Sequence, residues 1–255
     1  MNLGGIYKAG FYPYPPQALA LTTQLMTAPA EAPLRLLDPC AGEGAALAAV
    51  THRLTTLGAK PEPYAVELSD TRAKAAAQVL PATNVLKADW FDVSLTTASM
   101  SLLWLNPPYD FDLTGELQPS KRLEYTFLRS SYDRLMPGGL LVYIVPRWAL
   151  GIREVARLLA GHFEQHAVYA VPEYAQYQQV VLFAVRRAKA LPDSGAEAVL
   201  KGYAAHMPPA LDTATATYEL PAVDRKKRFL CYKNTLTPAE ERALAAEHGV
   251  LTTRA

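Results

Sequence analysis

The chain has 255 residues, of which half are hydrophobic, and a formal net charge of +1. This length suits one α/β domain with a small appendage, and the low charge means that nucleic-acid binding would need local basic patches. The two cysteines lie far apart and outside any CxxC pattern, which argues against a zinc site and fits a reducing, cytoplasmic compartment. No apolar run reaches about 18 residues and no signal-peptide pattern is present, so we expect neither a membrane span nor a leader.

Short apolar runs alternate with helix-like stretches from residue 34 to residue 186. The expected strands are 34–38, 64–67, 84–88, 101–105, 140–145, 165–170 and 180–186. The expected helices are 44–57, a helix through residue 79 capped by Ser69, 122–135, which Pro137-Gly138-Gly139 should end, and 152–159. Apolar strands separated by helices indicate a mainly parallel sheet that is covered on both faces. We therefore predict an α/β fold with a doubly wound, seven-stranded, mostly parallel sheet that ends in an antiparallel hairpin.

The character of the sequence changes after Ala188, where residues 191–195 resemble a linker. We expect a main domain over residues 1–188 and a small C-terminal extension over residues 189–255, serving substrate recognition or partner binding. Within the extension, residues 196–205 and 237–248 are expected to be helical, and residues 225–228 form a basic cluster. This piece is too short to build a core of its own.

The loop after the first predicted strand reads Asp-Pro-Cys-Ala-Gly-Glu-Gly over residues 38–44. Glycines allow a ligand to approach the backbone closely, and ligands of open α/β sheets bind at the carboxyl ends of strands. A carboxylate here suits a cationic ligand such as S-adenosylmethionine, although an ordinary small-residue turn would look similar. The candidate cofactor-binding residues of this loop are Asp38, Pro39, Cys40, Ala41, Gly42 and Gly44.

Acidic residues also follow the second and third predicted strands. Glu67, with Leu68 beside it, ends the second strand, where a carboxylate can accept both ribose hydroxyls or simply favour the start of the next helix. Asp89 follows the third strand and could accept from an adenine amino group. Trp90 could pack on the adenine ring or belong to the core.

The fourth predicted strand runs directly into Asn106-Pro107-Pro108-Tyr109. Two prolines fix the backbone and remove two N–H donors, which leaves carbonyl oxygens beside the Asn106 side-chain oxygen. Two such acceptors can polarise a planar amino group, whose lone pair is otherwise delocalised into a ring. Tyr109 offers a flat face on which an extruded base could stack. These four residues are therefore the candidate catalytic residues, with Asn106 also bordering the cofactor.

On these motifs the chain resembles class I, Rossmann-like methyltransferases, specifically amino-methyltransferases with a (D/N)PP(Y/F/W) motif. The form of residues 38–44 is similar to that of DNA adenine methyltransferases, and the likeness covers about residues 10–187. It implies S-adenosylmethionine as cofactor, no metal, and methyl transfer to the N6 amino group of adenine in DNA. Residues 10–16 resemble the aromatic-x-Thr-Pro element of that family, although Tyr14 stands where threonine is usual. By this resemblance Phe11, Tyr12 and Pro15 would cover the methionine end of the cofactor.

The same motif also occurs in protein glutamine N5-methyltransferases and in RNA amino-methyltransferases, so both remain alternatives. A catalytically silent scaffold that binds nucleic acid or a partner is a third. A dedicated DNA-reading region is missing, which leaves three expectations: low sequence specificity, a separate specificity protein that supplies it, or a chain that is part of a longer protein.

Candidate contacts to the substrate come from the loops after the catalytic motif and between the last two strands. They are Tyr109, Lys121, Arg122, Tyr174 and Tyr177. Further basic candidates for phosphate contacts are Arg147, Arg186, Arg187 and the cluster 225–228, although charged runs are often only solvated surface.

Overall fold

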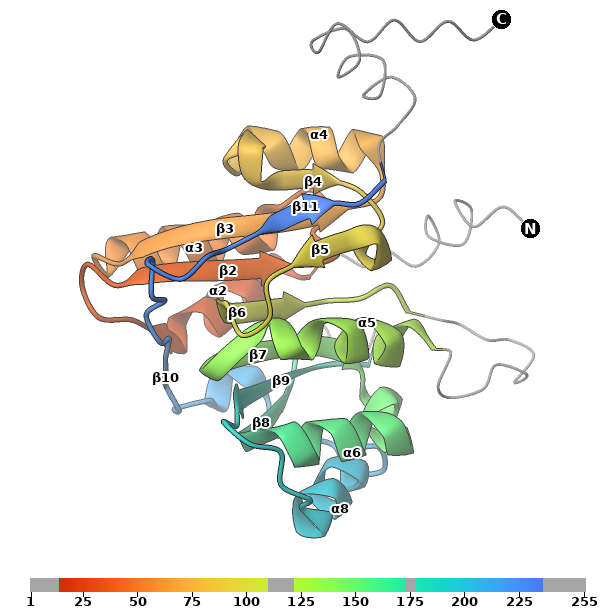
Figure 1. Cartoon of the computed structure of the whole chain (residues 1–255). Coiled ribbons are helices and arrows are strands. Elements are labelled where there is room, and N and C mark those ends of the chain that lie inside the picture. Colours follow the sequence, from red (N-terminus) through yellow and green to blue (C-terminus); the bar gives the residue numbers. More distant parts are fainter. Residues whose placement is uncertain (1–13, 110–121, 173–177, 236–255) are drawn as a thin grey trace, which may run out of the picture.

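A computed structural model describes residues 14–109, 122–172 and 178–235 of the chain. Its centre is a seven-stranded sheet with the strand order β4-β3-β2-β6-β7-β9-β8 (Figure 1). Neighbouring strands are parallel except for β9, which runs antiparallel to both β7 and β8. The predicted α/β fold with a terminal antiparallel hairpin is therefore confirmed. The strands of this sheet are β2 (Pro33–Asp38), β3 (Lys60–Glu67), β4 (Val85–Lys87), β6 (Met100–Leu105), β7 (Leu135–Pro146), β8 (Phe163–Ala170) and β9 (Gln179–Arg186).

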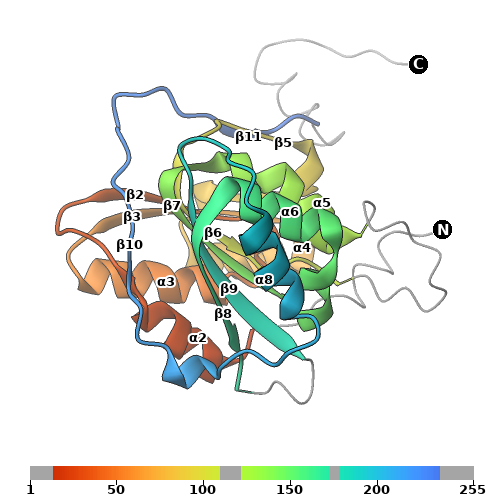
Figure 2. The same ribbon diagram turned by 90° about the horizontal axis from the view of Figure 1, so that it is seen from below.

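Helices cover both faces of this sheet (Figure 2). One face carries α2 (Pro16–Gln24) and α3 (Ala45–Thr56), and the other carries α5 (Leu123–Ser131), α6 (Arg153–His162) and α8 (Ser194–Gly202). Helix α4 (Asp70–Val79) packs against β3, β4 and α3. Successive side chains of a strand point to opposite faces, so Leu36 packs in the core beneath α3, whereas Leu37 packs in the core beneath α5 and α6. None of the described helices has the length and apolar character that crossing a bilayer requires.

Short 3-10 turns connect several of these elements. They are η1 (Ala82–Asn84), η2 (Trp90–Asp92), η4 (Tyr132–Arg134), η5 (Arg147–Gly151) and η6 (Leu211–Thr213). As predicted, Ser69 caps α4: its hydroxyl accepts a hydrogen bond from the backbone N–H of Arg72.

The Pro-Gly-Gly sequence plays a different role from the one predicted. The preceding helix α5 already ends at Ser131, and Pro137, Gly138 and Gly139 lie inside the long strand β7. Gly138 has a φ of 81°, and the pairing of β6 with β7 changes register between Met100 and Leu102. The expectation that this sequence ends the helix was therefore wrong, because the sequence instead forms an irregularity within a strand.

The described part of the C-terminal extension packs on the main domain. Helix α8 lies against α6, β10 (Tyr218–Glu219) pairs with β1 (Met26–Thr27), and β11 (Cys231–Lys233) pairs with β5 (Val93–Leu95). The ring of Phe229 lies 4.9 Å from that of Tyr64 and 4.1 Å from the Arg35 guanidinium carbon, so the chain before β11 covers part of the sheet (Figure 1). Up to residue 235, the predicted extension thus shares the core of the domain. The helix predicted over 237–248 lies outside the described residues.

Candidate active site at the carboxyl ends of three strands

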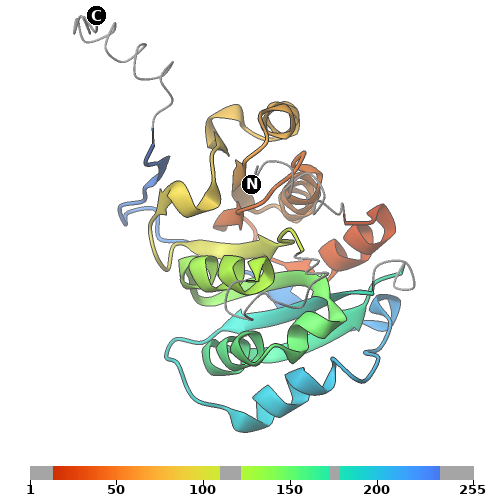
Figure 3. The same ribbon diagram turned by 90° about the vertical axis from the view of Figure 1, so that its right-hand side faces the viewer.

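The loops that follow β3, β2 and β6 meet at one edge of the sheet. These strands are neighbours and run parallel, so their carboxyl ends point the same way, toward the viewer of Figure 3. Ligands of open α/β sheets bind at this edge. The topology therefore brings together Glu67, the loop 38–44 and the motif 106–109, which are far apart in the sequence.

The loop after β2 takes a tight path that requires glycine. Gly44 has a φ of 81°, and a Cβ placed on it would lie 3.1 Å from the Cβ of Ala76 in α4. Only glycine therefore lets the chain turn into α3 this close to α4. The backbone N–H of Ala41 donates to the carbonyl of Val66 at 2.9 Å, which fixes the loop to β3.

Asp38 is a buried carboxyl group at the start of this loop. Only 3% of the residue is exposed, and its Oδ1 accepts a hydrogen bond from the Cys40 N–H at 3.0 Å. Burial raises the pKa of Asp38 to about 7; the hydrogen bond from Cys40 opposes this rise, and the nearby Glu67 carboxylate adds to it. Ionised Asp38 therefore lacks sufficient compensation, and a cationic ligand beside it would supply what is missing.

Glu67 is similarly buried, but both of its carboxylate oxygens accept hydrogen bonds. Its Oε2 accepts from the Gly42 N–H at 2.9 Å, and its Oε1 accepts from the Ser69 N–H at 2.7 Å and from Arg72 Nη2 at 2.7 Å. Glu67 thus connects the loop after β2 to the first turn of α4. Because Oε1 also accepts from Arg72 Nε, Oε2 is the oxygen with capacity left for a further donor such as a ribose hydroxyl. Sequence reasoning missed Arg72, although its place one turn into α4 was the available signal.

The Asn106 side chain begins a hydrogen-bond chain that runs from a partly buried position to the completely buried Gln179. The hydroxyl of Tyr109 donates to Asn106 Oδ1 at 2.9 Å, and Gln179 Nε2 donates to the Tyr109 oxygen at 2.8 Å. On its other side, the Asn106 carbonyl accepts from the Cys40 thiol at 3.2 Å. Burial raises the pKa of the Cys40 thiol well above its usual range, so it stays protonated as this donor. The motif after β6 is thereby joined to the loop after β2.

Tyr109 is not presented as an open stacking surface. Only 4% of it is exposed, and its hydroxyl is directed at Asn106 and Gln179. The expectation of a free aromatic face is corrected in this structure, because two polar partners hold the phenol inside the protein. Gln179, which sequence reasoning did not single out, is the first residue of β9 and is completely buried.

A cavity of about 310 Å³ lies between the loop after β2 and the motif after β6. Its wall includes Asp38, Cys40, Ala41 and Asn106, together with Tyr14 and Trp104 from the α2 side of the sheet. The Tyr14 hydroxyl forms a hydrogen bond with Thr22 Oγ1 at 2.9 Å, and Pro15 precedes the first turn of α2. A small cavity with a buried acid suits the cationic methionine end of S-adenosylmethionine, so the residues present fit the predicted cofactor.

The profile of the uncharacterised methyltransferase family DUF6094 matches residues 2–223. The chain belongs to this family. No curated protein matches the chain.

Solved structures with a similar fold share little sequence with this chain. A putative class I S-adenosylmethionine-dependent methyltransferase from Listeria monocytogenes is 16% identical, with a TM-score of 0.53 over 96% of this chain and 75% of that one. A methyltransferase subunit of a type I restriction-modification system from Streptococcus thermophilus is 15% identical, with a TM-score of 0.54 over 77% and 53%. A modification subunit of a putative type I restriction enzyme from Vibrio vulnificus is 16% identical, with a TM-score of 0.52 over 70% and 45%. The chain thus spans about half the length of these two subunits. The predicted class I methyltransferase fold is confirmed.

The two residues proposed to hold an adenine ring lie differently in this methyltransferase. Asp89 is exposed, and its side chain accepts from the Phe91 N–H at 3.0 Å. Trp90 is buried in the core, with its indole N–H donating to Ser130 Oγ at 2.7 Å. Trp90 therefore serves the core rather than an open ring-binding surface. Leu68, beside Glu67, is 39% exposed and keeps an apolar side chain at the surface.

Several of the residues predicted to contact phosphates have partners within the fold. Arg147 donates to the Ala205 carbonyl at 3.1 Å, Arg187 donates to the Phe163 carbonyl at 2.7 Å, and the Arg122 guanidinium lies 4.9 Å from the centre of the Trp148 ring. Likewise, Arg186 donates to the His162 carbonyl and Arg225 to Glu62. The remaining basic cluster is exposed at Lys226 and Lys227.

Some predicted residues lie outside the described part of the chain. These are Phe11, Tyr12, Lys121, Tyr174 and Tyr177. Within the described ranges, no group of three or more His, Cys, Asp or Glu side chains is arranged to hold a metal ion.

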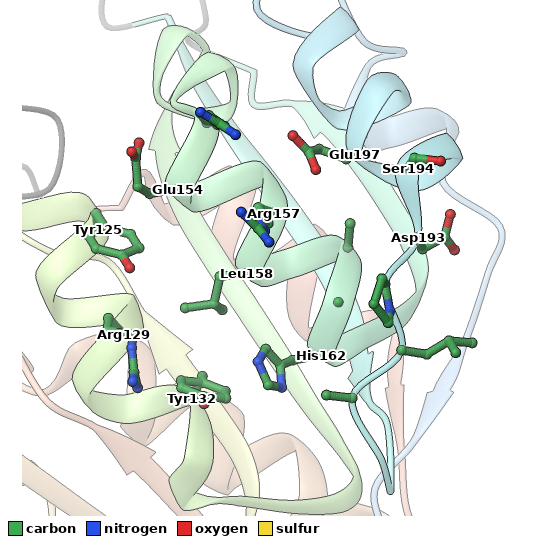
Figure 4. A pocket seen from close by; sticks show the side chains of 16 residues that line it. Tyr125, Arg129, Tyr132, Glu154, Arg157, Leu158, His162, Asp193, Ser194 and Glu197 are labelled. Atoms are coloured by element: carbon green, nitrogen blue, oxygen red, sulfur yellow. The ribbon is translucent and has the colours of Figure 1, made fainter.

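A second and larger cavity, of about 700 Å³, lies over α6 between α5 and α8 (Figure 4). Arg129 and Tyr132 border it on one side, Arg157 and His162 point into it from α6, and Glu197 faces it from α8. Among the described residues, neither Arg129 nor Arg157 forms an ion pair. This cleft is made by helices and lies apart from the motif residues.

Proposed function

We propose that this chain is an S-adenosylmethionine-dependent methyltransferase that methylates the N6 amino group of adenine in DNA. The observation that carries the proposal is the link between Asn106 and the loop that starts at Asp38. The Cys40 thiol donates a hydrogen bond to the backbone carbonyl of Asn106 at 3.2 Å, and both residues line the same cavity. The acceptor groups of the motif after β6 thereby lie next to the candidate site for the methyl donor.

When bound, S-adenosylmethionine supplies an electrophilic methyl group on a positively charged sulfur. Asp38 would favour the cationic methionine end, and Glu67 Oε2 would accept from the ribose. Asn106 Oδ1 and the Pro107 carbonyl would each accept one N–H of the target amine. These two bonds would orient the amine nitrogen toward the methyl donor, so positioning by Asn106 and the Pro107 carbonyl would supply much of the rate. The methylated nitrogen would release its extra proton to water.

Two observations support a DNA substrate: the motif after β6 and the solved structures with a similar fold. Two of the structures with a TM-score above 0.5 are modification or methyltransferase subunits of type I restriction systems. Beyond β9, the described residues add only the short elements α8, η6, β10 and β11. A separate specificity protein is therefore part of the proposal. A cytoplasmic location is proposed on the basis of Cys40 and Cys231, both of which are free thiols.

The test is transfer of labelled methyl groups to double-stranded DNA, single-stranded DNA, RNA and glutamine-containing protein, followed by mass spectrometry of the products. We expect N6-methyldeoxyadenosine from DNA. In Asn106→Ala the rate should fall by about 100- to 1000-fold, the usual effect of removing one oriented polar group at a reaction centre. Cofactor affinity should change little.

The matched control is Asn84→Ala, which removes the same side chain from η1 at a distance from the motif. It should keep the wild-type rate. If the labelled methyl group appeared in RNA or in protein glutamine and not in DNA, that polymer would be the substrate and the DNA assignment would be wrong. Equal rates in wild type and Asn106→Ala would refute the assigned role of the motif.

A further inference from the structure

A buried glutamine on β9 is coupled to the reaction centre through Tyr109. Gln179 stands opposite Pro146 at the start of the β7–β9 pairing and is completely buried. Its Nε2 donates to the Tyr109 oxygen at 2.8 Å, and the Tyr109 hydroxyl donates to Asn106 Oδ1 at 2.9 Å. The three side chains thus form a relay, in which Gln179 donates to Tyr109 and Tyr109 donates to Asn106.

The far end of this relay is unsatisfied. Gln179 Oε1 is buried and has no hydrogen-bond partner among the described residues. An unmade hydrogen bond at a buried acceptor costs about 1–3 kcal/mol. Turning the Gln179 amide by half a rotation would place Oε1 where it accepts from the Tyr109 hydroxyl. The Tyr109 oxygen would then accept from Asn106 Nδ2, and the direction of the whole relay would be reversed.

The two directions present Asn106 differently to a substrate. In the direction seen here, Asn106 Oδ1 already accepts from Tyr109, which weakens it as an acceptor for a target amine. In the reversed direction, Nδ2 faces Tyr109 and Oδ1 turns away from it. Burial raises the pKa of Tyr109 well above its usual range, so the phenol stays protonated. Its single O–H therefore always donates to one of its two neighbours, either Asn106 or Gln179.

We propose that Gln179 is a positioning residue that, through Tyr109, sets which atom of the Asn106 amide is offered to the target amine. This inference rests on the proposed amino-methyltransferase function. Formation of the amine–Asn106 bond would favour the reversed relay, in which Gln179 Oε1 accepts from Tyr109 and Nε2 takes the position that Oε1 leaves. No covalent bond changes; only two amide groups and one hydroxyl reorient.

The first test reads the Asn106 amide directly and does not need enzyme turnover. The chain has four asparagines, Asn2, Asn84, Asn106 and Asn234, so ¹⁵N-asparagine labelling gives a simple NMR spectrum of side-chain amides. Asn106→Asp identifies the Asn106 signals by their loss. Gln179→Glu introduces a group that only accepts when ionised, and it should shift those signals as the relay reverses. Gln165→Glu, the same change at an exposed position on β8, should leave them in place.

The second test measures kinetics. Gln179→Leu should lower kcat by about tenfold, the size of one hydrogen bond at a reaction centre, with an unchanged KM for S-adenosylmethionine. If Gln179 acts through Tyr109, the double variant with Tyr109→Phe should be no slower than Tyr109→Phe alone. Gln179→Glu should also add a pH-dependent step to the kcat profile of wild type, because its protonated form can donate as glutamine does.

The proposal is wrong if Gln179→Glu leaves the NMR signals of the Asn106 amide unmoved. It is also wrong if the reductions of kcat in Gln179→Leu and Tyr109→Phe multiply in the double variant. Circular dichroism of each variant checks that the fold is retained. The two hypotheses fail separately. If the wild-type protein methylated no amine in any substrate, the proposed function would be refuted. The NMR experiment would still decide whether Gln179 controls the orientation of the Asn106 amide.

Discussion

Two cavities in the described part of the chain differ in how they hold their charged groups. The smaller one, at the strand ends, is bordered by Asp38, and Glu67 and Gln179 lie buried behind it. The larger one, over α6, is lined by the exposed side chains of Arg129 and Arg157. A charge that faces water is screened and interacts weakly, whereas a buried one must find a specific partner. Size alone would favour the wrong cavity, and burial of polar groups marks the one where chemistry is expected.

The largest effect that follows from this difference concerns Glu67. Replacing it with alanine would remove the acceptor for the Gly42 and Ser69 N–H groups and leave the Arg72 guanidinium without its carboxylate. Removing one member of a buried ion pair typically costs about 3–5 kcal/mol. We expect Glu67→Ala to lower the free energy of unfolding by about that amount, measured in urea, and to weaken cofactor binding.

Asp70→Ala is the control for this experiment, because it breaks an ion pair with Lys74 in the same helix that is exposed to water. It should leave the unfolding midpoint nearly unchanged. If the two variants were equally stable, burial would not distinguish the strand-end site from the rest of the surface.

The next effect is the pH dependence caused by Asp38. Its pKa is about 7 in the folded protein and 3.8 for an ordinary aspartate, so the folded state holds a proton that the unfolded state has released between these values. Stability should therefore fall as pH rises from about 4 to about 7, by at most about 4 kcal/mol from this group. Asp38→Asn should remove this slope in urea titrations while keeping an acceptor for the Cys40 N–H.

Asp224→Asn is a close match as a control, because Asp224 Oδ1 also accepts the backbone N–H two residues later, at 2.9 Å, but at an exposed position. It should leave the slope as in wild type. Under the proposed function, the cationic cofactor favours ionised Asp38. Calorimetry near pH 6 in buffers of different ionisation enthalpy should then show proton release on binding, and proton uptake would contradict the assigned role of Asp38.

Much of this fold could be predicted because its strands are apolar and end in distinctive loops. The predicted strand 34–38 differs from β2 by one residue, and the motif after 101–105 directly follows β6. Strand β3 was harder to delimit, because Pro61 and Pro63 lie in a stretch that argues against a strand. They are tolerated because β4 pairs only with Ala65–Glu67, so β3 has β2 alone as a partner at the prolines.

The parts that could not be predicted depend on contacts between distant residues. A tryptophan at position 90 is more often a core residue than a ligand contact, and the hydrogen bond from its indole N–H to Ser130 of α5 supports the core. Gln179 lies 70 residues from Tyr109, and no local pattern marks it as a partner. For the same reason, the carbonyl partner of Arg187 could not be seen in the sequence, although its charge could. Sequence patterns identified the strand ends, whereas the hydrogen-bond network behind them required the packed structure.

The smallest expected effect belongs to the cleft over α6. Arg129 and Arg157 are exposed and form no ion pair within the described ranges, so replacing both with alanine removes charge without leaving a buried group unpaired. Surface changes of this kind usually alter free energies by less than about 0.5 kcal/mol, so methyl transfer at saturating substrate should stay within about twofold of wild type. The control removes two exposed charges elsewhere, in Lys60→Ala with Lys74→Ala, each of which forms a surface ion pair. A tenfold loss with DNA alone, seen only in the arginine variant and with cofactor binding intact, would mean that this cleft contacts the substrate. The contrast between the two cavities would then describe two parts of one binding surface instead of a site and an unrelated groove.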